Sequence, residues 1–280
     1  MTELLTPTDI TRLLRTHGLA PRKTAGQNFV VDPNTVRRIV SAADLDPDDE
    51  VLEIGPGLGS LTLGLQQVVR RVVAVEIDAG LVGALDEVVG HLDTVEVVHA
   101  DALRSDLGAL VRGGSCLRVV ANLPYNTATP LVFHALASPS VQDLFVMVQR
   151  EVGDRWQARV GDPTYSGVSL KLGLVAEVRT ELTIPRSVFH PVPNVDSVMV
   201  RLTRRADAPD SATMARLTSL ADAAFSQRRK TLRNTLRAVA SPQQLVVAAA
   251  AADIDLGARA ETLRPEDLRR LDAALQEERQ

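Results

Sequence analysis

"VLEIGPGLGSLT", residues 51–62, joins an apolar run to three closely spaced glycines and then to a second apolar run. The first run is typical of a buried strand, and the run after the glycines has the pattern of a helix. Glycine allows a tight turn and a close approach of a ligand to the backbone, because it carries no β-carbon. The stretch therefore predicts a strand, a ligand-binding loop at Gly55, Gly57 and Gly59, and a helix.

The same order of elements continues after this loop. Short runs rich in β-branched residues alternate with helical patterns, which indicates βαβ units and a parallel sheet. The predicted strands are residues 50–55, 70–78, 94–101, 117–124 and 141–149, and the predicted helices are residues 59–69, 79–92 and 129–138. Residues 178–185 and 196–204 alternate with a period of two and predict an antiparallel hairpin at the sheet edge. The fold class is therefore α/β and Rossmann-like.

A polar, proline-containing stretch at residues 203–212 predicts a linker. The 280 residues suffice for one large and one small domain. Beyond the linker, four helical patterns fill residues 213–280. We predict a Rossmann-like domain with an N-terminal extension over residues 1–205 and a small all-helical C-terminal domain over residues 206–280.

The composition is that of a globular protein, with 45% hydrophobic and 24% charged residues. No run approaches the roughly 20 apolar residues of a membrane span. The N-terminus lacks the apolar core and small-residue cleavage site of a signal peptide, and the single cysteine, Cys116, cannot form an internal disulfide. We expect a cytoplasmic monomer without membrane or metal partners.

The glycine loop has two candidate ligands. The dinucleotide fingerprint requires glycine at its first, third and sixth positions, and the sixth position here is Ser60. Glu53 precedes the loop, and its charge would repel a pyrophosphate but is harmless or helpful beside a sulfonium cation. The pattern favours S-adenosylmethionine (AdoMet) over NAD.

Acidic residues end the next two predicted strands. Glu76 lies 21 residues after Gly55, a spacing that suits a carboxylate accepting hydrogen bonds from both ribose hydroxyls. Asp101 ends the third strand, where it could bind the adenine amino group. Each acid alone is compatible with a helix N-cap, but in this order along one sheet edge they predict a nucleoside cofactor site.

The fourth strand ends in Asn122-Leu123-Pro124-Tyr125. The amine of adenine is a poor nucleophile because its lone pair is delocalised into the ring. The Asn122 side-chain oxygen and a backbone carbonyl of the Leu123-Pro124 turn can accept its two N–H groups and direct the lone pair at a methyl group. Tyr125 offers a face on which the base can stack. A plain turn would not require the aromatic residue.

A second aromatic, Phe189, begins "FHPVPNVDS", residues 189–197. Its prolines stiffen the loop, so that the ring can form the opposite wall for the base. A phenylalanine that merely caps the core explains the pattern equally well.

The segment "SQRRKTLRNTLR", residues 226–237, carries five bases and no acid in a chain of net charge −4. On one helix, Arg229, Arg233 and Arg237 would form a stripe, because they are spaced by four residues. Such a stripe suits an RNA phosphate backbone, although a solvated helix face has the same pattern. The predicted RNA-binding residues are Arg22, Lys23, Arg228, Arg229, Lys230, Arg233 and Arg237.

The chain resembles the ribosomal RNA adenine N6-dimethyltransferases, and most closely their small-subunit branch, the dimethyladenosine transferases linked to kasugamycin resistance. The resemblance spans residues 26–237 and rests on an ordered set of motifs. These are "GQNFVVD", "LEIGPGLGSLT", "VEID", "NLPYN", "FHPVPNVDSVMVRL" and "FSQRRKTLRNTL".

The resemblance implies a class I AdoMet-dependent methyltransferase. It implies the conversion of two adjacent adenosines near the 3′ end of small-subunit rRNA to N6,N6-dimethyladenosine during ribosome assembly, in a pre-ribosomal particle. Tyr125 and Phe189 become the stacking pair around the target adenine. By position, the implied AdoMet contacts are Asn28, Val30, Gly55, Glu76, Asp101 and Asn122, beside Gly57 of the loop.

Three alternatives stay open. The large-subunit rRNA adenine methylases of the antibiotic-resistance type share the catalytic loops, but the segments at 189–197 and 225–236 favour the small-subunit branch. DNA adenine methyltransferases share the Asn-x-Pro-Tyr chemistry but carry a larger recognition segment. A non-catalytic ribosome-assembly factor with the same fold would be free to lose Asn122 or Glu76, and both are present.

Overall fold

A computed structural model describes residues 3–21, 26–111 and 116–278 of the chain. Contacts between α-carbons group the chain into two compact units. The first unit comprises Met1–Gly153 and Arg179–Thr203, and the second comprises Asp154–Val178 and Arg204–Gln280. The second unit therefore contains the C-terminal helices. It also contains residues 154–178, which precede the predicted linker in the sequence.

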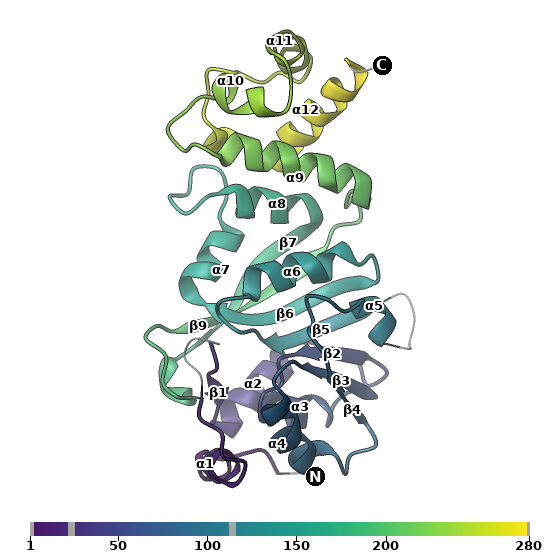
Figure 1. The fold of residues 1–280 in the computed structure, drawn as a ribbon, viewed down its shortest axis with the longest axis vertical. Helices are drawn as coiled ribbons and strands as arrows, with labels where there is room; N and C mark the ends of the chain where they lie inside the picture. The colour runs from purple at the N-terminus through teal and green to yellow at the C-terminus, as the bar shows by residue number, and fades with distance from the viewer. Residues whose placement is uncertain (1–2, 22–25, 112–115, 279–280) are drawn as a thin grey trace. The chain divides into compact units, whose positions relative to one another are not determined.

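A seven-stranded sheet forms the centre of the fold, in the order β4-β3-β2-β5-β6-β9-β7 (Figure 1). Neighbours from β4 to β6 run parallel, and β9 runs antiparallel to β6. The strands are β2 (Glu50–Ile54), β3 (Arg71–Glu76), β4 (Val95–His99), β5 (Leu117–Asn122), β6 (Val141–Gln149), β7 (Ala176–Ile184) and β9 (Ser197–Arg204). The predicted α/β class is confirmed, and the last two predicted strands are neighbours at one edge.

Helices of the first unit follow the strands as the sequence pattern predicts. Asp32 caps α2 (Pro33–Ala42) and Asp78 caps α4 (Ala79–Val89). Each side chain accepts a hydrogen bond from a backbone N–H. The helix of the glycine loop is shorter than predicted and ends at Leu65. The helices are α1 (Pro7–Thr16), α2 (Pro33–Ala42), α3 (Ser60–Leu65), α4 (Ala79–Val89), α5 (Leu107–Leu110) and α6 (Ala128–Ala137), with α7 (Arg150–Gln157) at the unit boundary.

The order of the strands fixes where a ligand can bind. From β2 the chain moves outward to β3 and β4, and it then returns to place β5 on the other side of β2. Loops leaving β2 and β5 therefore diverge, which opens a crevice at the carboxyl ends of these strands. A two-stranded antiparallel ribbon of β1 (Phe29–Val30) and β8 (Phe189–His190) pairs Val30 with Phe189.

A charged cluster ties the opposite edge of the sheet together. Asp143 on β6 accepts hydrogen bonds from Arg118 on β5 (3.3 Å) and from Arg201 on β9 (2.7 Å). Both guanidinium groups also donate to backbone carbonyls at the C-terminal end of α2, Arg118 to Ala43 (3.2 Å) and Arg201 to Ala42 (2.7 Å). The cluster thus links three strands and the end of a helix through paired, charge-assisted hydrogen bonds.

The second unit is helical apart from its part of β7. Its core is rich in leucine, including Leu217, Leu232, Leu236, Leu268 and Leu271, which are fully buried. The elements are α8 (Gly167–Val175), α9 (Ser211–Phe225), α10 (Leu232–Thr235), η3 (Leu236–Ala238), α11 (Pro242–Ala251), η4 (Ala260–Thr262) and α12 (Pro265–Glu277), where η marks a 3-10 helix.

The prediction of a single helix that carries Arg229, Arg233 and Arg237 as a stripe is wrong. Residues 226–230 form turns, and only α10 and η3 are helical in this stretch. The N–H groups of Leu232 and Arg233 bond instead to the carbonyls of Ala258 (2.9 Å) and Leu256 (2.9 Å). These bonds satisfy the backbone donors outside a helix, and they bring Leu232 into the core.

None of the helices in the described part of the chain combines the length and the apolar character needed to cross a membrane. Within residues 3–21, 26–111 and 116–278, no group of three or more His, Cys, Asp or Glu side chains could hold a metal ion.

Candidate active site

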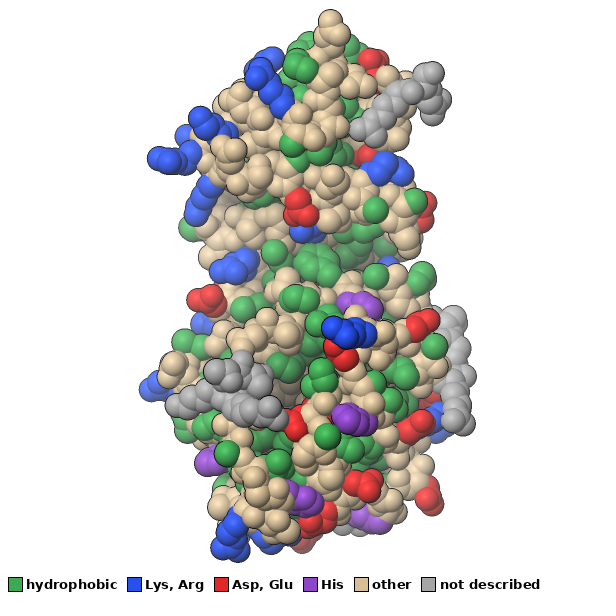
Figure 2. Space-filling view, viewed as in Figure 1, with side chains coloured by type: hydrophobic (Ala, Val, Ile, Leu, Met, Phe, Trp, Pro, Cys, Tyr) green, Lys and Arg blue, Asp and Glu red, His purple; other side chains and the backbone are tan. Residues whose placement is uncertain are grey.

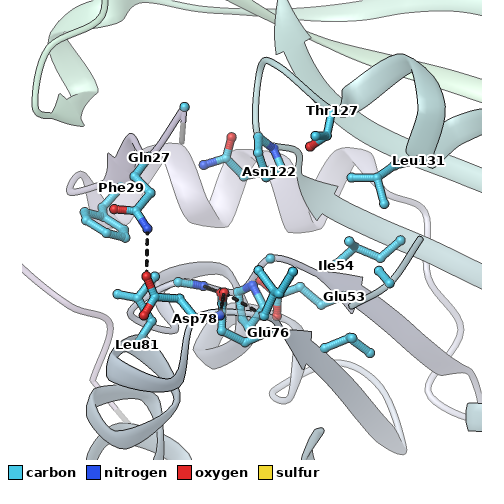
Figure 3. Close-up of a pocket in the computed structure, with 18 of the residues that line it drawn as sticks. Gln27, Phe29, Glu53, Ile54, Glu76, Asp78, Leu81, Asn122, Thr127 and Leu131 are labelled. Atoms are coloured by element: carbon cyan, nitrogen blue, oxygen red, sulfur yellow. Dashed lines mark hydrogen bonds between the residues drawn. The ribbon is translucent and has the colours of Figure 1, made fainter. Parts of the chain in front are cut away.

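A cavity of about 670 Å³ lies in the first unit, at the carboxyl ends of β2 to β5 (Figure 3). In Figure 3, Asn122 and Thr127 lie along one side of it and Glu76 and Asp78 along the other. The structure brings together every predicted cofactor residue at this cavity, and Pro124 with them. These lining residues are Asn28, Val30, Gly55, Gly57, Glu76, Asp101, Asn122 and Pro124.

The glycine loop forms the floor between β2 and α3. Gly55, Gly57 and Gly59 have φ values of +70°, +61° and +89°, which residues with a β-carbon rarely adopt. A β-carbon on Gly57 would lie 2.9 Å from the ring of Phe29, and one on Gly55 would lie 3.6 Å from Cδ of Pro124. The glycines therefore supply both the turn and the close packing of the loop against its neighbours.

The carboxylate of Glu76 is held by three backbone donors. Its Oε1 accepts from the N–H groups of Ile77 and Asp78, both at 2.9 Å, and its Oε2 accepts from Gly57 at 3.1 Å. Burial raises the pKa of Glu76, and these hydrogen bonds oppose the increase. The carboxylate thus joins the end of β3 to the glycine loop and keeps lone pairs free for a ligand, since each oxygen accepts more than one bond.

Asp101 lies at the cavity beyond β4 and is more exposed. Its Oδ1 accepts a hydrogen bond from the N–H of Leu103 (3.0 Å), and its Oδ2 lies 3.4 Å from Nε of Arg104. Its side chain is 32% exposed, so that it can still accept a hydrogen bond from a ligand.

The Asn122 amide has a defined orientation. Its Nδ2 donates to the backbone carbonyl of Asn28 at 2.9 Å. Among the described residues, none donates a hydrogen bond to Oδ1 of Asn122. The amide therefore presents its oxygen, Oδ1, to the cavity. The hydrogen bond to Asn28 in the N-terminal loop fixes this orientation.

The three residues after Asn122 have different surroundings. Leu123 is buried, and its N–H bonds to the carbonyl of Met147 on β6 (3.2 Å). Pro124 lines the cavity, and its carbonyl accepts from the N–H of Thr127 (3.1 Å). Tyr125 does not line the cavity, and its hydroxyl lies 2.8 Å from the hydroxyl oxygen of Ser197, the buried first residue of β9.

Phe189 does not lie at the cavity. It pairs with Val30 across the β1–β8 ribbon and is only 2% exposed, as part of the main hydrophobic core. The structure therefore places this ring in the core-capping position that the sequence left as an alternative.

Two polar residues of the cavity were missed in the sequence. Asp78 caps α4 by accepting from Gly80 (3.0 Å), and its other oxygen lies 3.4 Å from Nε2 of Gln27. This contact spans the cavity wall between the N-terminal loop and α4 (Figure 3). The N-cap pattern of "EIDAG" was the available signal for Asp78, but no local pattern of sequence pairs it with Gln27.

The basic segment belongs to the second unit. Arg228, Arg229, Lys230, Arg233 and Arg237 are all exposed, and none forms an ion pair within the described residues. Blue side chains gather in Figure 2 over the segment labelled α10 in Figure 1. They form a basic surface on a turn, α10 and η3 rather than a stripe on one helix. Arg22 and Lys23 lie outside the described residues.

The cavity fits a nucleoside cofactor such as AdoMet. Its volume lies within the range of about 300 to 1,000 Å³ that is common for ligand sites. The carboxylates of Glu76 and Asp101 are acceptors for hydroxyl and amino groups. The left-handed glycines keep side chains out of the loop, which leaves room for a ligand beside the backbone.

Comparisons with known proteins agree with this site. A family model described as ribosomal RNA adenine dimethylase matches residues 18–277. A ribosomal RNA small subunit methyltransferase A of Thermobifida fusca is 48% identical over 275 residues, which cover 96% of this chain and 95% of that protein.

Two solved structures of high similarity also carry names of RNA-modifying enzymes. A dimethyladenosine transferase of Plasmodium falciparum superposes with a TM-score of 0.72 at 25% identity, covering 86% of this chain and 94% of that one. The 23S rRNA methyltransferase ErmE superposes with a TM-score of 0.66 at 30% identity, covering 89% and 99%. With this match and this cavity, the chain belongs to the ribosomal RNA adenine dimethylase family and is an AdoMet-dependent methyltransferase.

Proposed function

We propose that this enzyme transfers methyl groups from AdoMet to N6 of two adjacent adenosines near the 3′ end of small-subunit rRNA, forming N6,N6-dimethyladenosine during ribosome assembly. The observation that carries the chemistry is the Asn122 amide, which presents a free acceptor to the cavity beside the glycine loop. An acceptor at that point suits a substrate amine, which brings N–H groups to it.

The turn after β5 supplies the two acceptors for the amine. Oδ1 of Asn122 is one, and a backbone carbonyl of the Leu123-Pro124 turn is the other; the carbonyl of Pro124 also accepts from Thr127 and has a second lone pair. Two acceptors favour a pyramidal nitrogen and direct its lone pair. When bound, AdoMet supplies an electrophilic methyl group on a positively charged sulfur. The nitrogen would form its bond to the methyl carbon as the carbon–sulfur bond breaks and its electron pair stays on sulfur. The methylated nitrogen is then positively charged and acidic, so it loses one proton to solvent without a strong base.

We assign the cofactor contacts by the same geometry. Glu76 accepts from the ribose hydroxyls, Asp101 accepts from the adenine amino group, and Gly55 and Gly57 leave room for the ligand at the loop. Asn28 and Val30 bound the cavity from the N-terminal loop and β1. The Val30 carbonyl is already engaged by the hydroxyl of Ser60 at 2.7 Å, which holds β1 against α3.

The target base stacks on Tyr125 in this proposal. The hydroxyl of Tyr125 is tied to Ser197, so its ring is anchored at one end. Phe189 completes the stack only if its ring leaves the core position in which the structure places it. In that position it supports β1 through the β1–β8 ribbon instead.

The choice of the small subunit is supported by the names of the more similar relatives. Eight proteins of 44–48% identity are named ribosomal RNA small subunit methyltransferase A, whereas the 23S rRNA methyltransferase ErmE is 30% identical. We propose a monomer that acts in the cytoplasm on a pre-ribosomal particle, with residues 1–205 as the catalytic domain and residues 206–280 as the RNA-binding domain.

Methyl transfer to separate ribosomal substrates tests the proposal. Purified enzyme and labelled AdoMet are incubated with unmethylated small subunits, naked small-subunit rRNA and large subunits, and the modified bases are mapped. We expect label on N6 of two adjacent adenosines near the 3′ end of the small-subunit rRNA. Label confined to the large subunit would contradict the choice of substrate.

The basic surface of the second unit is the proposed RNA contact. Replacing Arg229 and Arg233 by Glu should weaken RNA binding and lower the salt dependence of binding by about two released counterions. The measurement is rRNA affinity at several salt concentrations. Arg37→Glu with Arg38→Glu, on exposed positions of α2, makes the same change of charge as a control. Equal losses in both double variants would mean that only total charge matters.

A further inference from the structure

Glu53 is a buried carboxyl group of the cavity to which no contact with the cofactor or the base has been assigned above. It lies on β2 immediately before the glycine loop, lines the cavity and is only 1% exposed. Its Oε2 is buried and has no hydrogen-bond partner among the described residues. Glu76 is similarly buried but receives three backbone N–H donors, so these two glutamates of the cavity are solvated very differently.

Little around Glu53 stabilises a negative charge, because the hydroxyl of Thr62 lowers the pKa of Glu53 by less than burial raises it. Burial raises the pKa of Glu53 to about 8, and the negative charge of Glu76 adds to the increase. Glu76 is the only charged group that acts on it within the described residues, and it has the same sign. A buried carboxylate with one unpartnered oxygen and no cation beside it is costly, so Glu53 is mainly protonated near pH 7 in the ligand-free protein.

The position of Glu53 relates it to the reacting end of a ligand. Pro124, from the turn that receives the amine, packs 3.6 Å from the site of a β-carbon on Gly55. Gly55 follows Glu53 by two residues, and both line the cavity. Under the proposed function the methyl group must lie beside this turn, and the sulfur that carries it is positive before transfer and neutral afterwards.

We infer that Glu53 is a specificity-determining residue that ionises when the sulfonium cofactor binds, so that the enzyme releases a proton on binding AdoMet and holds the neutral-sulfur product, S-adenosylhomocysteine, more weakly. This inference rests on the proposed function of the cavity. The cation supplies the partner that the buried carboxyl lacks, and methyl transfer removes that partner. The lost attraction favours exchange of product for fresh cofactor between successive methylations.

Calorimetric binding of the two ligands tests the inference without any turnover. Titrations from pH 6 to pH 9, in pairs of buffers with different ionisation enthalpies, measure both affinity and the number of protons released. For the wild-type protein, the affinity for AdoMet should rise with pH by up to about tenfold per unit below pH 8 and level off above it. The affinity for S-adenosylhomocysteine should not show the part of this rise that comes from ionisation of Glu53.

Glu53→Gln is the test variant, because glutamine keeps the shape of the neutral acid. It should abolish the Glu53-dependent proton release and reduce the preference for AdoMet over S-adenosylhomocysteine by about tenfold at pH 8. Protons released by the ligands themselves are the same for the variant and the wild type, so they cancel in the difference between the two proteins. Glu50→Gln is the matched control, because Glu50 lies at the other end of β2, outside the cavity, and pairs with Arg70.

Stability of the ligand-free protein provides a second measurement. A folded-state pKa above the unfolded one means that Glu53 opposes folding increasingly as pH rises from about 4.5 to about 8. Glu53→Gln should remove this loss of stability with pH, whereas Glu50→Gln should retain it.

Each other outcome has a distinct meaning. An unchanged preference and unchanged proton release in Glu53→Gln would overturn the inference while leaving the methyltransferase function intact. Equal losses for both ligands would also overturn it, because they would place Glu53 beside the ammonium group that the two ligands share. A wild-type protein that binds neither ligand would instead contradict the proposed function.

Discussion

Asn122→Ala should reduce kcat by about 100- to 1,000-fold, the loss typical of removing one positioned group that stabilises a transition state. The variant lacks the acceptor that faces the cavity, but the backbone of the turn stays in place through the Leu123–Met147 and Pro124–Thr127 hydrogen bonds. Single-turnover methylation of the rRNA substrate measures the effect. AdoMet affinity, measured separately, should fall far less than kcat.

Asn122→Asp separates the acceptor oxygen from the hydrogen bond that orients it. It keeps an oxygen toward the cavity but loses the Nδ2 donor to the Asn28 carbonyl, so the side chain is no longer held. We expect it to be nearly as impaired as Asn122→Ala. Asn34→Ala, at an exposed position of α2, should be unaffected. Near-normal kcat in Asn122→Ala would mean that the amide does not position the amine.

Glu76→Ala should weaken AdoMet binding by about 100-fold and destabilise the protein. It removes the proposed acceptor for the ribose, and it leaves the N–H groups of Gly57, Ile77 and Asp78 without their partner. Hydrogen bonds to a charged group contribute roughly 1.5–3 kcal/mol each, and water that enters the cavity replaces part of them, so we expect a loss of about 2–4 kcal/mol. Calorimetry and urea unfolding measure the two effects.

Glu87→Ala is the control for this variant. Glu87 lies on α4 of the same unit, is 40% exposed and pairs with Arg12 and His17 at the surface. Its removal should cost no more than about 1 kcal/mol and leave AdoMet affinity unchanged. If Glu76→Ala bound AdoMet as tightly as Glu87→Ala, the carboxylate would not contact the ribose.

The centre of the sheet was predictable from the sequence because strands β2, β3, β5 and β6 are largely buried. Such strands read as continuous apolar runs, and the residues that end them are polar or glycine. The order Gly55, Glu76, Asp101 and Asn122 along the chain therefore translated directly into one sheet edge, where the structure places all four around one cavity.

Features set by distant contacts were not predictable. The arginines at 229, 233 and 237 have helical spacing, but Leu232 and Arg233 bond to a loop more than 20 residues away, and the helix is interrupted. The apolar character of Phe189 suits a base-stacking wall and a core position alike, and its buried position in the β1–β8 ribbon depends on pairing with Val30, which is distant in sequence. The Gln27–Asp78 contact joins residues 51 positions apart.

The cluster of Arg118, Asp143 and Arg201 lies at the edge of the sheet opposite the cavity. The ion pairs that link the strands are thus separated in space from the groups that bind the ligands. Loops at the cavity can accumulate substitutions without disrupting these ion pairs. The architecture is for that reason suited to evolving new substrate preferences, and laboratory selection for altered base recognition should begin at residues 125–127 and keep Asn122 and the cluster intact.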